Sequence, residues 1–241
     1  MQELWNGFKC EKFTFEGRNA IVVFPEEGTA NGRLALKTEY WGAFPDVEIR
    51  LLKKGFHLAF IKGNSRFAPK EDCDARAAFV RHLAKKYHLN EKCVPVGMSC
   101  GGGQAVRFAG FYPELVSCMF IDAPVLNYCD FPAKLRTPEI FESIWQEEFL
   151  VAYPGMTRAK LLNFSEHPIH MADVLVEHRI PIVMVWGTED QTVYYNENGL
   201  LLEQAYEGTG LMKVIPVAPR GHHPHGKMHD NSEIVEFILE H

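Results

Sequence analysis

Basic residues, long apolar runs and paired cysteines are all scarce in this sequence, and each shortage argues against a class of function. The 25 Lys and Arg residues are outnumbered by 31 Asp and Glu, which gives a formal net charge of −6. Proteins that bind nucleic acid carry a basic stripe for the phosphates, so no nucleic-acid partner is expected. No apolar run approaches the length of a membrane span, so no membrane partner is expected either.

Cysteine usage and the first residues point to one compartment. None of the 6 cysteines stands in a C-x-x-C pair or in another zinc spacing. Isolated thiols of this kind are typical of a reducing environment. The segment 1–5 shows neither the basic nor the apolar region of a secretory leader. We therefore expect a cytoplasmic location.

Length and patterning predict a single α/β domain over residues 1–241. The composition, 46% hydrophobic and 23% charged, is that of an ordinary globular protein. Short apolar runs alternate with longer segments of helical spacing, which is typical of a mostly parallel sheet with helices on both faces. We expect strands at 12–16, 20–24, 34–38, 56–61, 93–96, 116–121, 180–186 and 212–217, and helices at 47–54, 70–87, 103–111, 197–206 and 232–240. Helical spacing predicts a buried stripe on the helix 70–87, formed by Ala75, Ala78, Phe79, His82 and Leu83.

The alternation lapses between residues 127 and 178, which is too long for a plain connection. We interpret 127–178 as a helical cap or lid insertion over the carboxyl edge of the sheet, with helical pieces at 138–151 and 158–162. A surface excursion without a role in binding is the alternative. Its aromatic residues either line an apolar cleft or pack against the core; they are Phe131, Phe141, Trp145, Phe149 and Tyr153.

The most informative segment is Gly97-Met98-Ser99-Cys100-Gly101. It follows the expected strand 93–96 and precedes the expected helix 103–111. A serine between two glycines, at a tight turn from strand to helix, is typical of the nucleophile elbow of a serine hydrolase. The turn presents an exposed hydroxyl at a helix N-terminus, where backbone N–H groups favour developing negative charge. A glycine-rich turn with an idle serine is the alternative.

An acid and a histidine follow in the order that a Ser-His-Asp triad on such a sheet requires. Asp190 comes just after the strand 180–186, and His222 comes after the strand 212–217. Because parallel strands end at one edge of the sheet, we expect Ser99, Asp190 and His222 to meet there. The imidazole takes the serine proton during attack, and the carboxylate orients the imidazole. Other candidates for the acid are Glu189, Asp122 and Asp130.

Several imidazoles cluster after Gly221. His223 and His225 are alternatives to His222 as the base, and His229 lies beyond them. A metal site is the competing interpretation, but the spacing matches no strong ligand pattern and Pro224 prevents helical pairing of the ligands. We expect no metal.

The tetrahedral oxyanion needs two backbone donors. One is expected from the N–H of Cys100, and the other from Tyr40 or Trp41 in the loop after the strand 34–38. Cys100 itself stands one residue past the apex and is not expected to be the nucleophile. Glu39, beside this loop, is interpreted either as a carboxylate that supports the loop or as a contact for a substrate hydroxyl or amine.

These segments together resemble the α/β-hydrolases over nearly the whole chain. The elbow, the acid loop Trp186-Gly187-Thr188-Glu189-Asp190-Gln191-Thr192-Val193 and the histidine loop Gly221-His222-His223-Pro224-His225 carry the resemblance. The histidine loop is similar to that of bacterial members with a GHHPH sequence. The resemblance implies an eight-stranded, mostly parallel sheet with Ser99, Asp190 and His222 as the triad. One departure is the loop after residue 38, which lacks the His-Gly-Gly sequence of many esterases.

We therefore expect a serine hydrolase that cleaves a small carboxylic ester through an acyl-enzyme, without a cofactor. An acylated or sugar-derived alcohol is one option for the substrate. A peptidase of prolyl-oligopeptidase type is the second interpretation, although the chain is short for one. A catalytically inactive α/β-hydrolase-fold protein that binds ligands or partners is the third.

Overall fold

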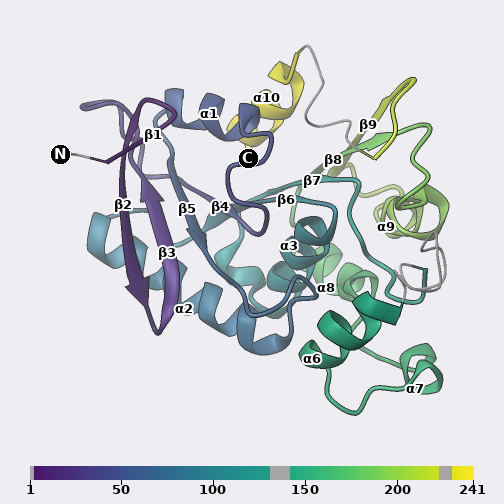
Figure 1. Cartoon of the computed structure of the whole chain (residues 1–241). Helices are drawn as coiled ribbons and strands as arrows, with labels where there is room; N and C mark the ends of the chain where they lie inside the picture. Colours follow the sequence, from purple (N-terminus) through teal and green to yellow (C-terminus); the bar gives the residue numbers. More distant parts are fainter. Residues whose placement is uncertain (1–2, 131–141, 223–229) are drawn as a thin grey trace.

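An open sheet forms the centre of the molecule (Figure 1). The computed structural model describes residues 3–130, 142–222 and 230–241. Within them nine strands pair in the order β1-β2-β3-β5-β4-β6-β7-β8-β9. The strands are β1 (Leu4–Trp5), β2 (Phe8–Phe15), β3 (Arg18–Val23), β4 (Leu34–Lys37), β5 (His57–Ile61), β6 (Cys93–Met98), β7 (Met119–Asp122), β8 (Ile182–Gly187) and β9 (Met212–Val217).

Strand direction divides the sheet into two parts. Three neighbouring pairs are antiparallel: β1 with β2, β2 with β3, and β3 with β5. Every neighbouring pair in the remaining order, β5-β4-β6-β7-β8-β9, is parallel. The parallel strands therefore end at the same edge, where open α/β sheets carry their sites. The mostly parallel sheet is confirmed. The described residues contain one strand more than the eight expected, because the two-residue β1 is too short to leave a periodic signal.

Helices cover both faces, as predicted (Figure 1). One apolar cluster joins α1 and α10 to the sheet, and a second cluster joins α2, α3, α8 and α9 to the opposite face. Successive side chains of a strand point to opposite faces of the sheet. In β6, Val94 and Val96 therefore belong to the first cluster and Cys93 to the second. The bounds are α1 (Asp46–Lys53), α2 (Lys70–Tyr87), α3 (Cys100–Phe111), α8 (Ala172–Glu177), α9 (Gly199–Ala205) and α10 (Ser232–Glu240).

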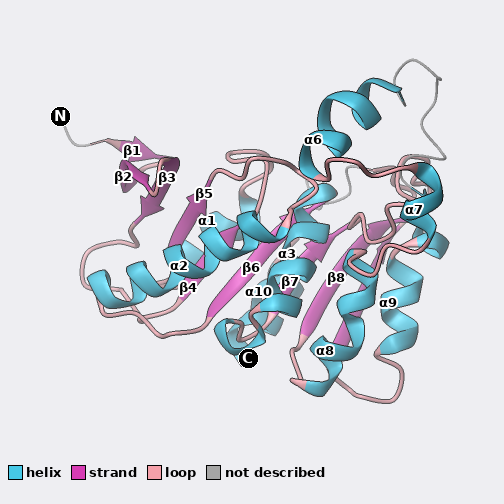
Figure 2. Cartoon of the chain, turned by 90° about the horizontal axis from the view of Figure 1, so that it is seen from below, coloured by secondary structure: helices cyan, strands magenta, loops and turns pink. Residues whose placement is uncertain are grey.

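The expected insertion contains short helical turns in its described part, residues 142–178. Helix α6 and helix α7 project beyond the sheet (Figure 2). The turns are a π-helical η2 (Ile144–Phe149), α6 (Leu150–Ala152), α7 (Arg158–Leu162) and a 3₁₀ turn η3 (Pro168–Met171); two further 3₁₀ turns elsewhere are η1 (Pro113–Leu115) and η4 (Tyr195–Glu197).

Helix α2 has its expected bounds, and three residues of its expected buried stripe, Ala75, Phe79 and Leu83, are buried. His82, placed on the buried stripe by periodicity, is exposed and lies beside Phe15 at 5.0 Å between ring centroids. Asp72 and Arg76 are buried instead, each at 1% exposure. Both charged side chains can be buried because they bond to loop backbone: Asp72 accepts from Asn64 and Ser65, and Arg76 donates to the Thr38 carbonyl. None of the described helices is both long and apolar enough to cross a membrane.

Candidate active site

Ser99 occupies a strained turn between β6 and α3. Its backbone angles are φ 52° and ψ −123°, which lie in a region that residues with side chains rarely adopt. Backbone hydrogen bonds hold the turn: the Ser99 N–H donates to the Asp122 carbonyl at 2.8 Å, and the Ser99 carbonyl accepts from Val125 at 3.0 Å. The strain is thus balanced by contacts to the segment after β7.

The glycines around Ser99 are required by close backbone approach. A Cβ on Gly97 would lie 2.2 Å from the Gly101 carbonyl oxygen, and one on Gly103 would lie 2.2 Å from that of Val125. Real Cβ atoms do not come so close. The poor helix propensity of these glycines explains why the sequence placed the start of the helix at residue 103 when α3 begins at Cys100.

The structure brings Ser99, His222 and Asp190 together. His222 Nε2 lies 3.0 Å from Ser99 Oγ, and His222 Nδ1 lies 2.7 Å from Asp190 Oδ2. With Nδ1 protonated, the ring donates to Asp190 and accepts the serine proton at Nε2. The side chains of His222 and Asp190 are 12% and 3% exposed, so the series is largely shielded from water.

The acid loop and the histidine loop are tied to each other through their backbones. The Glu189 N–H donates to the Arg220 carbonyl at 2.7 Å, and the Thr188 N–H donates to the Val217 carbonyl at 3.1 Å. A Cβ on Gly187 would lie 2.2 Å from the Gly221 carbonyl oxygen. The loops that follow β8 and β9 therefore position Asp190 and His222 as one unit.

Asp190 has an environment that favours its charged form. Burial alone raises the pKa of this carboxyl group, but hydrogen bonds from His222, Val193 and Thr192 outweigh it and hold the pKa below its usual value. The backbone N–H groups of Thr192 and Val193 reach Asp190 Oδ1 at 2.7 and 3.0 Å. A charged Asp190 can stabilise the imidazolium that forms when His222 accepts a proton.

The other acids lie in different settings. Glu189 is exposed, although it neighbours Asp190. Asp130 is buried and accepts a hydrogen bond from Asn198 Nδ2 at 3.0 Å. Asp122 is fully buried at the end of β7. The alternative bases His223 and His225, and also His229, lie outside the described residues.

Backbone donors for an oxyanion lie on both sides of Ser99. Cys100 is the first residue of α3, and the first N–H groups of a helix have no acceptor within it. The loop after β4 approaches α3 from the other side, where Thr38 Oγ1 donates to the Gly101 carbonyl at 2.7 Å. The structure therefore places the predicted donor segments beside the elbow.

Tyr40 and Trp41 face different clusters. Tyr40, with a left-handed φ of 54°, packs against the apolar cluster that contains Cys100. Burial, together with the neighbouring Cys100 thiol, raises the pKa of the Tyr40 hydroxyl. Trp41 packs into the cluster of α1 and α10, with its ring 5.0 Å from that of Trp5. Of the two, Tyr40 is the residue directed toward the elbow.

The Cys100 thiol is unsuited to act as a nucleophile. It is 3% exposed, and burial raises its pKa although Arg66 and Tyr40 act in the opposite direction. A protonated, buried thiol is a poor nucleophile.

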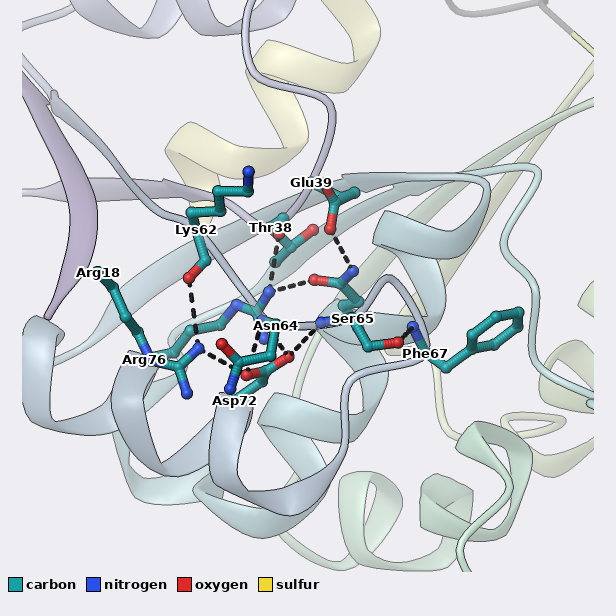
Figure 3. Close-up of polar contacts among 10 residues, drawn as sticks. Arg18, Thr38, Glu39, Lys62, Asn64, Ser65, Phe67, Asp72 and Arg76 are labelled. Atoms are coloured by element: carbon teal, nitrogen blue, oxygen red, sulfur yellow. Dashed lines mark hydrogen bonds and ion pairs between the residues drawn. The ribbon is translucent and has the colours of Figure 1, made fainter. Parts of the chain in front are cut away.

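A polar network behind the loop after β4 was not predicted (Figure 3). Arg76, buried in α2, donates to the Thr38 carbonyl at 3.0 Å and also to Gln104 Oε1. Gln104 Nε2 in turn donates to Glu39 Oε2 at 2.7 Å. The sequence offered two signals for this network: Glu39, one interpretation of which was a support for the loop, and the charged Arg76 within the apolar periodicity of 70–87.

Asp72 anchors the adjoining loop in the same network (Figure 3). Its carboxylate accepts from the backbone N–H groups of Asn64 and Ser65 at 2.9 and 3.1 Å, and it pairs with Arg18 at 2.6 Å. The loops after β4 and β5 are thereby fixed to α2 and α3.

The aromatic residues 145, 149 and 153 pack rather than line an open cleft. Trp145 and Phe149 are 6% and 1% exposed, with ring centroids 5.0 Å apart. Their cluster also contains Cys100 from the elbow and Val193 from the acid loop. The described part of the insertion therefore packs on loops at the carboxyl edge of the sheet. Phe131 and Phe141 lie outside the described residues.

Over residues 3–130, 142–222 and 230–241, no group of three or more His, Cys, Asp and Glu side chains could hold a metal ion. The histidines that suggested a metal, apart from His222, fall in the segment 223–229, which is not described.

Several solved structures share this fold. Acylaminoacyl peptidase of Pyrococcus horikoshii superposes with a TM-score of 0.72 at 13% identity, over 97% of this chain and 41% of its own. Dipeptidyl peptidase 4 of Porphyromonas gingivalis gives a TM-score of 0.70 at 13% identity, over 97% of this chain and 35% of its own. Est1E from Butyrivibrio proteoclasticus gives a TM-score of 0.68 at 16% identity, over 96% of this chain and 98% of its own.

The chain therefore has the α/β-hydrolase fold, as its motifs predict. It spans less than half the length of the two peptidases. No family model and no curated protein matches the sequence. A fold shared at such low identity does not define a reaction, which has to be argued from the site.

Proposed function

We propose that this protein is a serine hydrolase that cleaves a small carboxylic ester through an acyl-enzyme intermediate. The observation that carries the proposal is the hydrogen-bonded series from Ser99 Oγ through the His222 ring to Asp190 Oδ2, with distances of 3.0 and 2.7 Å. A serine hydroxyl becomes an effective nucleophile when an oriented imidazole can take its proton. The strained backbone of Ser99 supports the same role, because strain of this kind gathers at functional sites.

The reaction has two halves. Ser99 Oγ attacks the ester carbonyl while its proton passes to His222 Nε2, and the resulting oxyanion accepts hydrogen bonds from the N–H groups of Cys100 and Tyr40. The intermediate collapses, and the alcohol leaves with the proton from His222. Water then attacks the acyl carbonyl and gives a proton to His222. The second intermediate collapses by breaking the bond to Ser99 Oγ, which takes that proton back from His222, and the carboxylic acid is released. Asp190 stabilises the imidazolium in both halves.

A peptidase is the second candidate, and the fold shared with acylaminoacyl peptidase and dipeptidyl peptidase 4 favours it. We prefer the ester because the match to Est1E extends over 98% of that chain, whereas more than half of each peptidase lies outside its match. Hydrolysis of aminoacyl-proline amides without hydrolysis of esters would reverse this order.

The test compares the wild type with Ser99→Ala on p-nitrophenyl acetate. We expect the rate constant to fall at least about a thousandfold, since triad members act as a unit. The exposed Ser165 offers a matched control, and Ser165→Ala should keep full activity. A fluorophosphonate should label the wild type and Ser165→Ala but not Ser99→Ala. An unlabelled wild type would instead favour an inactive protein that binds ligands or partners.

A further inference from the structure

Glu39 places a carboxylate directly before Tyr40, whose N–H is the proposed second oxyanion donor. Its Cβ lies 3.0 Å from the position that a Cβ on Gly101 would occupy. The side chain therefore lies over the first turn of α3, next to Ser99. Burial is the main cause that raises the pKa of the neighbouring Cys100 thiol, and the negative charge of Glu39 also raises it.

The two carboxylate oxygens of Glu39 have unequal partners. Oε2 is anchored from the interior by Gln104 Nε2 at 2.7 Å, and Gln104 is 1% exposed. Oε1 accepts the Tyr40 N–H at 3.3 Å, which is longer than a typical N–H···O bond. The residue is half-buried, so solvent or a ligand can reach it. Oε1 therefore has capacity for a further donor.

The charge of Glu39 has no direct counterion in the part of the chain that the structure describes. Arg66 pairs with Glu148 at 2.6 Å, and Arg76 is separated from the carboxylate by the Gln104 amide. A tetrahedral oxyanion at the Tyr40 N–H would meet a like charge that also competes for the same donor. A substrate hydroxyl would leave this repulsion in place, whereas a cation would remove it.

We propose that Glu39 binds a protonated amine of the substrate next to the scissile carbonyl. This inference rests on the proposed function and narrows its substrate class to esters that carry an ammonium group. The ammonium donates to Oε1, balances the carboxylate charge and draws Oε1 from the Tyr40 N–H, which then serves the oxyanion.

The experiment measures kcat/KM at neutral pH on two matched ester pairs, by titration of the acid released. Dimethylaminoethyl acetate and isoamyl acetate differ only in whether a protonated nitrogen or a CH group stands in the alcohol. Ethyl N,N-dimethylglycinate and ethyl isovalerate make the same comparison in the acyl group. Each pair is assayed with the wild type and with Glu39→Gln, which removes the charge and keeps the size of the side chain.

We expect Glu39→Gln to lower kcat/KM for the amine member of one pair about tenfold relative to its isostere, the effect of a charge-assisted hydrogen bond. The pair that responds identifies whether the amine lies in the alcohol or in the acyl group. Glu189→Gln is the matched control, since it removes the same charge from an exposed site and should leave the preference unchanged.

Equal changes for both members of both pairs would overturn the proposal and leave Glu39 as a support for the loop. A cooperative urea transition near that of the wild type shows that Glu39→Gln folds. Calorimetric titration of Ser99→Ala with the amine esters gives a readout without turnover, and binding should weaken in the Ser99→Ala, Glu39→Gln double variant. Undiminished hydrolysis by Ser99→Ala would instead contradict the proposed function itself.

Discussion

The elbow and the segment 142–178 share one apolar cluster, but different interactions hold them. Backbone hydrogen bonds fix Ser99 to Asp122 and Val125, and glycines allow the close approach. Segment 142–178 has a backbone contact of this kind, from the Ile169 N–H to the Leu126 carbonyl at 3.1 Å, but it also depends on side chains. Glu148 pairs with Arg66, and the buried Arg107 reaches Glu166 Oε2 at 2.9 Å. The geometry at Ser99 thus depends on close backbone approach that glycine allows, whereas the segment depends on ion pairs and hydrogen bonds of individual side chains.

The largest expected effect comes from Asp190→Asn. The amide cannot stabilise the imidazolium or select the tautomer, so kcat on p-nitrophenyl acetate should fall about ten-thousandfold, as it does in established Ser-His-Asp enzymes. The urea midpoint should change little. Glu189→Gln on the adjacent residue is the control and should keep its rate; a loss within a few-fold for Asp190→Asn would contradict the assigned role.

Gly103→Ala tests the backbone packing of the elbow. The added Cβ would lie 2.2 Å from the Val125 carbonyl oxygen, and overpacking of this kind should lower the free energy of unfolding by about 3 kcal/mol. Gly221→Ala is the comparison, since among the described residues its Cβ would meet only the Glu189 carbonyl oxygen, at 3.9 Å. Equal urea midpoints for the two variants would show that the elbow tolerates bulk.

His167 tests the attachment of segment 142–178 by pH. Its Nδ1 accepts the Tyr128 N–H at 3.1 Å, and its Nε2 donates to the Leu161 carbonyl at 3.0 Å, so the folded state requires the neutral ring. Burial lowers the pKa of this imidazole below its usual value. The unfolded chain therefore binds the proton first, and stability present above about pH 6.5 is lost as the pH falls.

The measurement for His167 is the urea midpoint at about pH 7.5 and about pH 5.5, on either side of the usual histidine pKa. Acidification should lower the midpoint of the wild type more than that of His167→Gln. The exposed His88 provides His88→Gln, which should follow the wild type. If the urea midpoints of all three proteins fall equally on acidification, His167 does not account for the pH dependence of stability.

The smallest effect is expected for Glu148→Gln. Its pair with Arg66 is 37% and 30% exposed, so solvent screening should limit the loss of stability to about 0.5 kcal/mol. Because the pair joins segment 142–178 to the loop after β5, KM for the ester should change more than kcat. An unchanged KM with a reduced kcat would show instead that the Arg66–Glu148 pair affects the reaction step and not the binding of the ester.

Features with a local backbone signature could be predicted from the sequence. The elbow follows from glycine spacing between a strand and a helix, and the bounds of α2, α7, β9 and α10 follow from hydrophobic periodicity. The structure brings Ser99, His222 and Asp190 together because parallel strands end at one edge. Their catalytic roles remain a proposal.

Features that depend on single polar residues could not be predicted. Arg76 joins Thr38 to Gln104, and Gln104 joins Glu39, but Arg76 and Gln104 are far from the segment 38–39 in the chain and each looks ordinary in its own segment. Periodicity likewise chose His82 for the buried stripe, because it carries no information about which charged side chains find partners. The oxyanion loop has the same limitation, since the different packing of Tyr40 and Trp41 arises from tertiary contacts.

The spread of the three side chains along the polypeptide has a consequence for biosynthesis. Ser99, the proposed nucleophile, is translated before β9 and before the loop that carries His222, its proposed proton acceptor. A nascent chain that still lacks His222 also lacks the imidazole that lies 3.0 Å from Ser99 Oγ. Under the proposed mechanism, turnover that appears during cell-free translation would therefore report that β9 has joined the sheet.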